Sequence, residues 1–191
     1  MAQLTQMPHY VGWEAFTRNH ISVLKLFLFY ALPLSVVPPA MIYYAGVEYG
    51  GHLLPSLSPM RLDVISIVFF IAELVMTFVV AFIVQRMTEV ADTKPAFEDA
   101  YKLAVVVPTP LWLAPLFLFI PSFDLNITIG ALALILSGVL LFYSVPPILK
   151  VKEESTIMLS SSILAIGMVA WAIMMYLTLL TWSFVTYRLF F

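Results

Sequence analysis

The sequence predicts an all-α membrane protein: a single polytopic transmembrane bundle of five helices whose third span is kinked by proline. Of its 191 residues, 62% are hydrophobic and only 10% are charged, whereas soluble domains carry about 25% charged residues. The apolar residues form five runs that are long enough to cross a bilayer. At this length, residues 1–191 form one membrane domain with no room for a separate soluble domain.

The composition also argues against several kinds of site. The chain has no cysteine, which excludes a disulfide framework, a thiolate metal site and a cysteine nucleophile. It has no GxSxG or HExxH motif, no phosphate-binding glycine loop and no basic patch for nucleic acid. We therefore predict no enzymatic activity, no cofactor and no nucleic-acid partner.

The chain begins with a mixed segment and then enters the first span. Residues 1–20 place Tyr10, Trp13 and Phe16 three positions apart, as in a short cytoplasmic helix lying in the membrane interface. A polar tail with scattered aromatic residues is the alternative. The first span is expected at about 21–47, and its second half contains three prolines that should break it: Pro33, Pro38 and Pro39.

The second and third spans are separated by a charged connection. A loop with paired glycines and two prolines, residues 48–60, precedes the second span at about 62–85. The third span, at about 101–121, is almost wholly apolar but contains four prolines: Pro108, Pro110, Pro115 and Pro121. A bend in lipid must be shielded because hydrocarbon offers no partner to an unpaired backbone group. We therefore expect this span to be kinked between Val105 and Pro115 and to lie in the middle of the bundle.

The last two spans follow after short connections. A tight turn, PSFDLN, makes the third and fourth spans antiparallel neighbours. The fourth is expected at about 127–145, where Pro146 and Pro147 should end it, and the fifth at about 157–182.

The distribution of lysine and arginine predicts the orientation in the membrane. One side of a five-span topology would carry seven of these residues: Arg18, Lys25, Arg86, Lys94, Lys102, Lys150 and Lys152. The other side would carry only Arg61 and Arg188. This asymmetry predicts a cytoplasmic N-terminus and a C-terminus on the outer side.

Glu73 is the principal candidate for a functional residue. It lies about eleven residues into the second span, which is near the middle of the bilayer at a rise of about 1.5 Å per residue. An ionisable group at this depth is a candidate functional site, and desolvation favours its neutral form. Its possible hydrogen-bond partners are Thr77, Thr109 and Ser137, which complete a candidate intramembrane polar site. A glutamate that only bonds two helices together is the alternative.

A metal site is a weaker hypothesis. Glu48, His52 and Asp63 lie on the predicted outer side, and imidazole and carboxylate groups are suitable zinc ligands. Their spacing is not that of a metal motif, so we expect solvated side chains there and no bound metal.

The second half of the chain resembles the bacterial branch of the Yip family, the Ypt/Rab-interacting-protein-like membrane proteins. The resemblance covers roughly residues 100–190, from VPTPLWLAPLFLFIP through GVLLFYSVPPILKVKEESTIMLSSSILAIG to the terminal YRLF. It implies five spans, a cytoplasmic N-terminus and, for a bacterial member, the inner membrane with a periplasmic C-terminus. Eukaryotic members act in vesicle traffic and bind Rab-type GTPases. They carry a longer N-terminal region with an Asp-Leu-Tyr-Gly-Pro motif, which this chain lacks, so a Rab-type GTPase is not an expected partner.

Two functional hypotheses follow. The first is a non-enzymatic membrane organiser or scaffold that contacts lipids and other membrane proteins. The second is a small transporter or ion-binding protein with a buried site around Glu73, since transporters place substrate sites beside broken helices near the bilayer midplane. A cavity that reaches Glu73 would favour the second hypothesis, and a dry bundle with Glu73 bonded to a neighbouring helix would favour the first.

Overall fold

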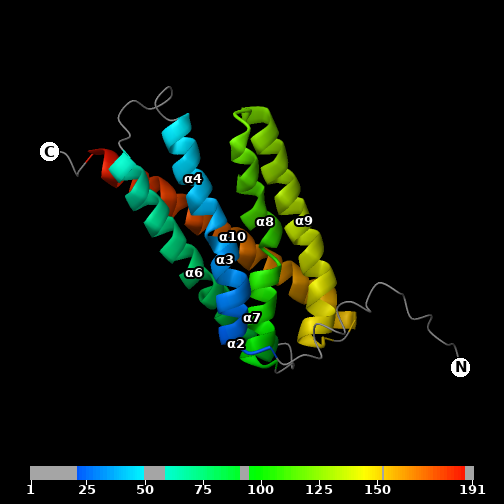
Figure 1. Ribbon diagram of the computed structural model, residues 1–191. Coiled ribbons are helices and arrows are strands. Elements are labelled where there is room, and N and C mark those ends of the chain that lie inside the picture. Colours follow the sequence, from blue (N-terminus) through cyan, green and yellow to red (C-terminus); the bar gives the residue numbers. More distant parts are fainter. Residues whose placement is uncertain (1–20, 50–58, 91–94, 152, 188–191) are drawn as a thin grey trace, which may run out of the picture.

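The computed structural model describes residues 21–49, 59–90, 95–151 and 153–187, and these segments are helical with short connections (Figure 1). Five segments have the length and hydropathy of membrane spans: Val23–Glu48, Pro59–Glu89, Phe97–Phe119, Phe123–Leu149 and Ser155–Val185. The predicted fold class, an all-α bundle of five spans, is confirmed.

The spans consist of the following elements. The first contains α2 (Val23–Leu26), the π-helical turn η2 (Phe27–Ala31), α3 (Leu32–Ser35) and α4 (Val37–Glu48), and the second is α6 (Pro59–Val90). The third contains α7 (Phe97–Val106), α8 (Thr109–Leu113) and the 3₁₀ helix η3 (Ala114–Phe119). The fourth is α9 (Phe123–Leu149) and the fifth is α10 (Glu153–Tyr187).

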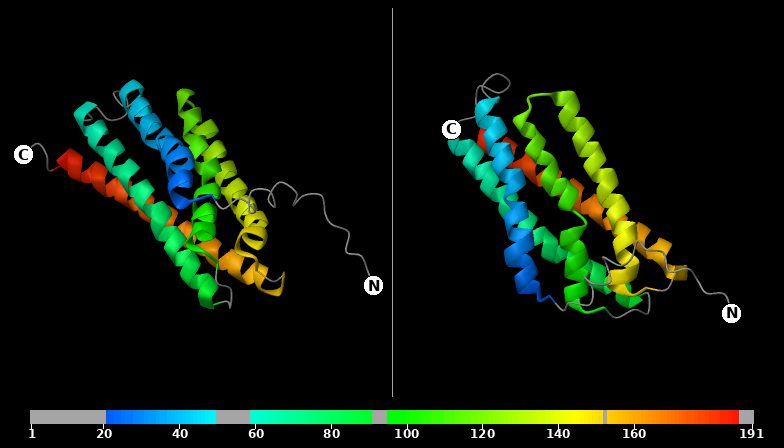
Figure 2. Two further views of the ribbon diagram at one scale, coloured as in Figure 1. Left: turned by 60° about the horizontal axis from the view of Figure 1, so that its bottom comes forward. Right: turned by 45° about the vertical axis from the view of Figure 1, so that its right-hand side comes forward.

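The helices form two groups that α10 joins. In Figure 1, α4 and α6 lie on one side, α8 and α9 lie on the other, and α10 crosses behind both. The two views of Figure 2 show the same crossing, and α10 packs against α6 and α9. The described chain enters at one end of the bundle with α2 and leaves near the opposite end with α10 (Figure 1).

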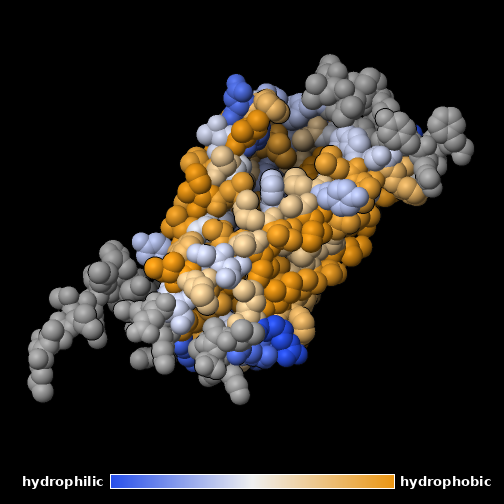
Figure 3. Space-filling model, turned by 180° about the vertical axis from the view of Figure 1, so that it is seen from behind, coloured by the Kyte–Doolittle hydropathy of each residue, from blue (hydrophilic) through white to orange (hydrophobic). Residues whose placement is uncertain are grey.

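The first half of the third span is the buried centre of the bundle. Every residue of α7 from Ala100 to Val106 is buried, and all of these side chains except that of Lys102 belong to two hydrophobic clusters. One cluster joins α7 to α6, α9 and α10, and the other joins it to the start of the first span. The outer surfaces of the remaining spans are apolar, and Figure 3 shows hydrophobic residues covering most of the face on the far side from Figure 1. A hydrophobic outer surface of this kind is suited to contact with lipid.

The third span is broken where its prolines predict. Helix α7 ends at Val106, Val107 and Pro108 form a turn, and α8 begins at Thr109. Pro110 has no N–H to donate to the Val106 carbonyl, which would otherwise lack its helical partner. The Thr109 hydroxyl donates to this carbonyl at 2.7 Å, as hydroxyl side chains do at proline breaks inside membranes.

The first and fourth spans differ from the sequence-based expectation. The first span is interrupted at Val36, where α3 ends and α4 begins just ahead of Pro38 and Pro39, as expected for its second half. It also has a π-helical turn at Phe27–Ala31, in its first half and just before Pro33, which was not expected. The fourth span does not stop at Pro146 and Pro147, because α9 continues through both to Leu149. Ile148 and Leu149 are buried in the hydrophobic core, and this packing offsets the lost backbone bonds. The helix ends instead at Lys150, which adopts a left-handed conformation with φ of 53°.

Gly46 lies at the close contact between α4 and α6. A Cβ atom at this position would lie 2.4 Å from Cδ2 and 2.9 Å from Cδ1 of the buried Leu62 side chain. We expect Gly46→Ala to lower the free energy of unfolding by about 1–3 kcal/mol, as overpacking does in well-packed interiors. Gly167→Ala on α10 is the matched control, because a Cβ there meets nothing within 4 Å. Thermal unfolding in detergent should show a loss of stability for Gly46→Ala and no loss for Gly167→Ala. Equal stability of the two variants would refute the close contact between α4 and α6.

Candidate intramembrane site

Glu73 lies in the middle of α6 and faces the interior of the bundle. Its side chain is only 9% exposed, and its Oε2 atom is buried without a hydrogen-bond partner in the described part of the chain. A buried carboxyl oxygen without a partner loses the hydration that it has in water. Such an atom is therefore a candidate contact for a ligand.

The Glu73 carboxyl group has one polar neighbour from another span. The indole N–H of Trp112, on α8, approaches it as a hydrogen-bond donor, and Trp112 is itself buried. Thr77 lies one turn along α6, but its hydroxyl donates to the Leu74 carbonyl at 2.8 Å. The carboxyl group is therefore only partly satisfied by the protein.

Ser137 and Thr109, the two candidates from neighbouring spans, have different environments. Ser137, on α9, is buried, and its Oγ atom has no hydrogen-bond partner in the residues that the structure describes. The Thr109 hydroxyl is bonded elsewhere: it donates to the Val106 carbonyl and lies 2.7 Å from the Tyr30 hydroxyl. It therefore stabilises the broken third span.

A cavity of about 490 Å³ joins Glu73, Thr77, Trp112 and Ser137. Residues from all five spans line it, and most are apolar, including Leu103, Leu111, Leu134 and Met174. Among the described residues of its wall, Glu73 is the only one with a readily ionisable side chain, and no lysine, arginine or histidine is present. The volume lies within the range of about 300–1,000 Å³ typical of small-molecule sites.

The metal hypothesis gains no structural support. Glu48 and Asp63 are exposed, one near the end of α4 and the other in the first turns of α6, while His52 lies outside the described residues. No group of three metal-ligating side chains occurs in the described ranges.

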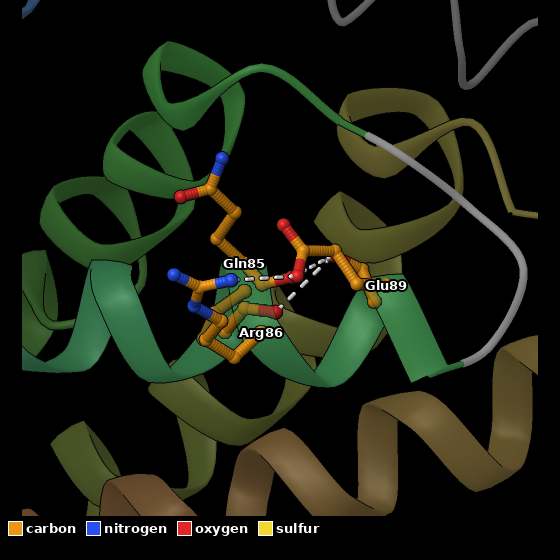
Figure 4. A network of polar contacts seen from close by, with 5 residues as sticks. Gln85, Arg86 and Glu89 are labelled. Carbon is orange, nitrogen blue, oxygen red and sulfur yellow. Dashed lines mark hydrogen bonds and ion pairs between the residues drawn. The ribbon is translucent and has the colours of Figure 1, made fainter.

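The charged residues at the end of α6 belong to a different region from the cavity. Figure 4 shows Gln85, Arg86 and Glu89, and the Arg86 guanidinium lies 3.0 Å from the Glu89 carboxylate. Both of these side chains are exposed, so the pair contributes little to stability. Nearby, Lys102 is only 1% exposed and lies 3.3 Å from Asp99.

Two features of the site are missed by the sequence reasoning. Trp112 is not among the candidates, although it is the residue of the third span that approaches Glu73. The apolar nature of the cavity is also unexpected. Trp112 could have been predicted as a partner of Glu73, because its indole N–H lies in the middle of an apolar span and such a donor usually finds a hydrogen-bond partner when it is buried.

The fold and the site describe a polytopic membrane protein with an internal cavity, and comparison with known proteins identifies its family. The Yip1 domain profile matches residues 10–174, so the chain belongs to the Yip1 domain family. This finding confirms the resemblance seen in the sequence.

Two curated relatives carry the name inner membrane protein YohC, from Escherichia coli strain K12 and from E. coli O6:H1 strain CFT073. Each is 24% identical to this chain over 181 residues, which cover 93% of this chain and 92% of the relative. No solved structure matches the chain.

Proposed function

We propose that this Yip1-family protein is a non-enzymatic protein of the bacterial inner membrane that binds a small molecule between its helices, as a small transporter or an intramembrane binding protein. The observation that carries this proposal is a cavity whose wall includes the buried, partly satisfied carboxyl group of Glu73. In this role Glu73 and Ser137 supply polar contacts for the ligand, and the apolar wall holds the rest of it.

The broken third span supports the same proposal. Residues Pro108, Leu111, Trp112 and Pro115, from the turn and the two short helices after it, contribute to the cavity wall. Transporters commonly place a substrate site beside a discontinuous helix near the bilayer midplane. Glu73 is not assigned a catalytic role, because no second acid, base or nucleophile with a readily ionisable side chain lies beside it among the described residues of the wall.

The organiser or scaffold hypothesis is the second candidate, and family resemblance is its support. Under this hypothesis the protein acts through contacts of its outer surface with lipids and other membrane proteins. A closed, dry bundle would be sufficient for that role, so accessibility of the cavity distinguishes the two candidates.

The absence of native cysteine permits a direct test of accessibility. Ser137→Cys places a thiol on the cavity wall, whereas Ala81→Cys places one in the packed core, where the residue is fully buried and does not line the cavity. We expect N-ethylmaleimide to label Ser137→Cys in the folded protein much faster than Ala81→Cys, with both labelled after denaturation. Equally slow labelling of both folded variants would favour the organiser.

The proposed orientation places the N-terminus in the cytoplasm and the C-terminus in the periplasm. In support, Lys25, Arg86, Lys102 and Lys150 lie at one end of the bundle, where α2 and α7 begin and α6 and α9 end (Figure 1). Arg61 lies at the opposite end, where α6 begins. Such asymmetry is typical of cytoplasmic ends. Reporter fusions at residue 94 and after the C-terminus should report opposite sides, and same-side signals would contradict the five-span topology.

A further inference from the structure

The charge of the cavity wall restricts the ligands that it can bind. Glu73 presents a buried carboxyl oxygen without a partner, and the described wall has no lysine, arginine or histidine to balance an anionic ligand. An anion would find no cation in the wall to pair with, and it would be repelled whenever Glu73 is ionised. A positively charged ligand would instead favour the ionised form of Glu73 by placing an opposite charge beside it.

The side chains of the wall favour an organic cation over a bare metal ion. Divalent cations such as Ca²⁺ are held by six to eight oxygen ligands. Besides Glu73, the side-chain oxygen atoms of the described wall are those of Thr77, Asn126, Ser137 and Thr178. The Thr77 hydroxyl donates to its own helix, and the Asn126 amide nitrogen donates to the Ile120 and Ser122 carbonyls at the turn before α9. A bare metal ion would have only a few oxygen atoms of a mostly apolar wall to replace its hydration, whereas an organic cation can also use the apolar surface.

The remaining surface of the cavity is suited to an apolar body with a positive charge. Aliphatic and methionine side chains make up most of the wall, and three aromatic side chains also line it: Phe69, Trp112 and Trp171. Aromatic faces attract organic cations through their quadrupoles, most strongly where water is excluded.

From these observations, and resting on the proposed function, we propose that the cavity binds lipophilic cations, with the positive charge next to Glu73 and the apolar body against the helices. The class comprises monovalent amines and quaternary ammonium or phosphonium ions that carry apolar groups. No bond is formed or broken; any proton on Glu73 leaves when the cation binds.

Two ions of similar shape and opposite charge provide the test. We expect the purified full-length protein in detergent to bind tetraphenylphosphonium saturably in equilibrium dialysis, and to show no saturable binding of tetraphenylborate. Glu73→Gln keeps the shape of the side chain but removes its charge, and should weaken tetraphenylphosphonium binding by at least about tenfold. Glu89→Gln is the matched control, because it removes an exposed carboxylate at the end of the same helix and should bind like the wild type.

A second variant keeps the test informative if Glu73→Gln does not fold. Gly138→Leu adds a side chain to the cavity wall from α9, where a Cβ meets nothing closer than 3.9 Å, and should block binding while Glu73 is retained. Equal binding of tetraphenylborate, or full binding by a folded Glu73→Gln variant, would overturn the proposal. If Ser137→Cys is labelled but neither ion binds, the ligand class is wrong and the proposed function stands. If Ser137→Cys is also unreactive, the proposed function fails as well.

Discussion

Tyr101→Ala is expected to lower the free energy of unfolding by about 3–5 kcal/mol, the usual cost of truncating a large buried aromatic residue. Tyr101 is fully buried at 0% exposure near the start of the third span. Its ring lies 4.9 Å from that of Phe78 and 6.2 Å from that of Phe97, between centroids, and Phe78 in turn contacts Phe27. Tyr101 therefore joins aromatic side chains from the first three spans, and its removal leaves a void at their junction.

Tyr101→Phe is the control for this prediction. The Tyr101 hydroxyl lies near that of Thr77, but it has no hydrogen bond of ordinary geometry in the described residues. Removing an unsatisfied hydroxyl is nearly neutral or stabilising, so Tyr101→Phe should unfold at or above the wild-type temperature in detergent. A small loss of stability for Tyr101→Ala, or a large loss of stability for Tyr101→Phe, would mean that packing of the aromatic ring does not stabilise the bundle.

The fold is largely predictable from the sequence because a bilayer restricts the possible structures. Long apolar runs must be helical in lipid, and the Pro108 and Pro110 pair lacks the donors needed to continue a helix. The low helix propensity of Pro146 and Pro147 does not predict where the fourth span ends, because burial of Ile148 and Leu149 extends the helix past both prolines. Such tertiary packing is not visible in the local sequence.

The site is predictable only in part. The depth of Glu73 follows from counting along one helix, and Thr77 follows from helical periodicity. Trp112 and Thr109 lie beyond the break at Pro108, where the helical phase is reset, so counting cannot assign which of them faces Glu73. The structure gives this position to Trp112 and places Thr109 against Tyr30. The cavity itself depends on how α10 joins the two groups of helices, which no single segment specifies.

Glu73→Leu is expected to fold with stability close to that of the wild type, while binding or transport at the cavity is lost. An unsatisfied buried polar group costs about 1–3 kcal/mol, and the Glu73 Oε2 atom is such a group. The change also removes the contact with Trp112, and a hydrogen bond between membrane helices contributes about 1 kcal/mol. The change also leaves the buried Trp112 indole N–H without this acceptor, so the gain and the losses should nearly cancel. Glu73→Gln should remain close to wild-type stability, because the amide retains an acceptor for the indole N–H.

The two substitutions separate a structural role of Glu73 from a functional one. If Glu73 mainly bonds α6 to α8, the Glu73→Leu variant should unfold at a lower temperature than the wild type. The Glu73→Gln variant should then unfold at the wild-type temperature, and transport should be unchanged in both. If Glu73 serves a ligand, both variants should keep the fold, and both should lose cation flux in proteoliposomes, since neither side chain can ionise. Thermal unfolding in detergent and flux into proteoliposomes, measured on the same preparations of wild type, Gln and Leu, distinguish these patterns. A destabilised Leu variant together with wild-type flux in Gln would assign Glu73 to the fold and favour the organiser.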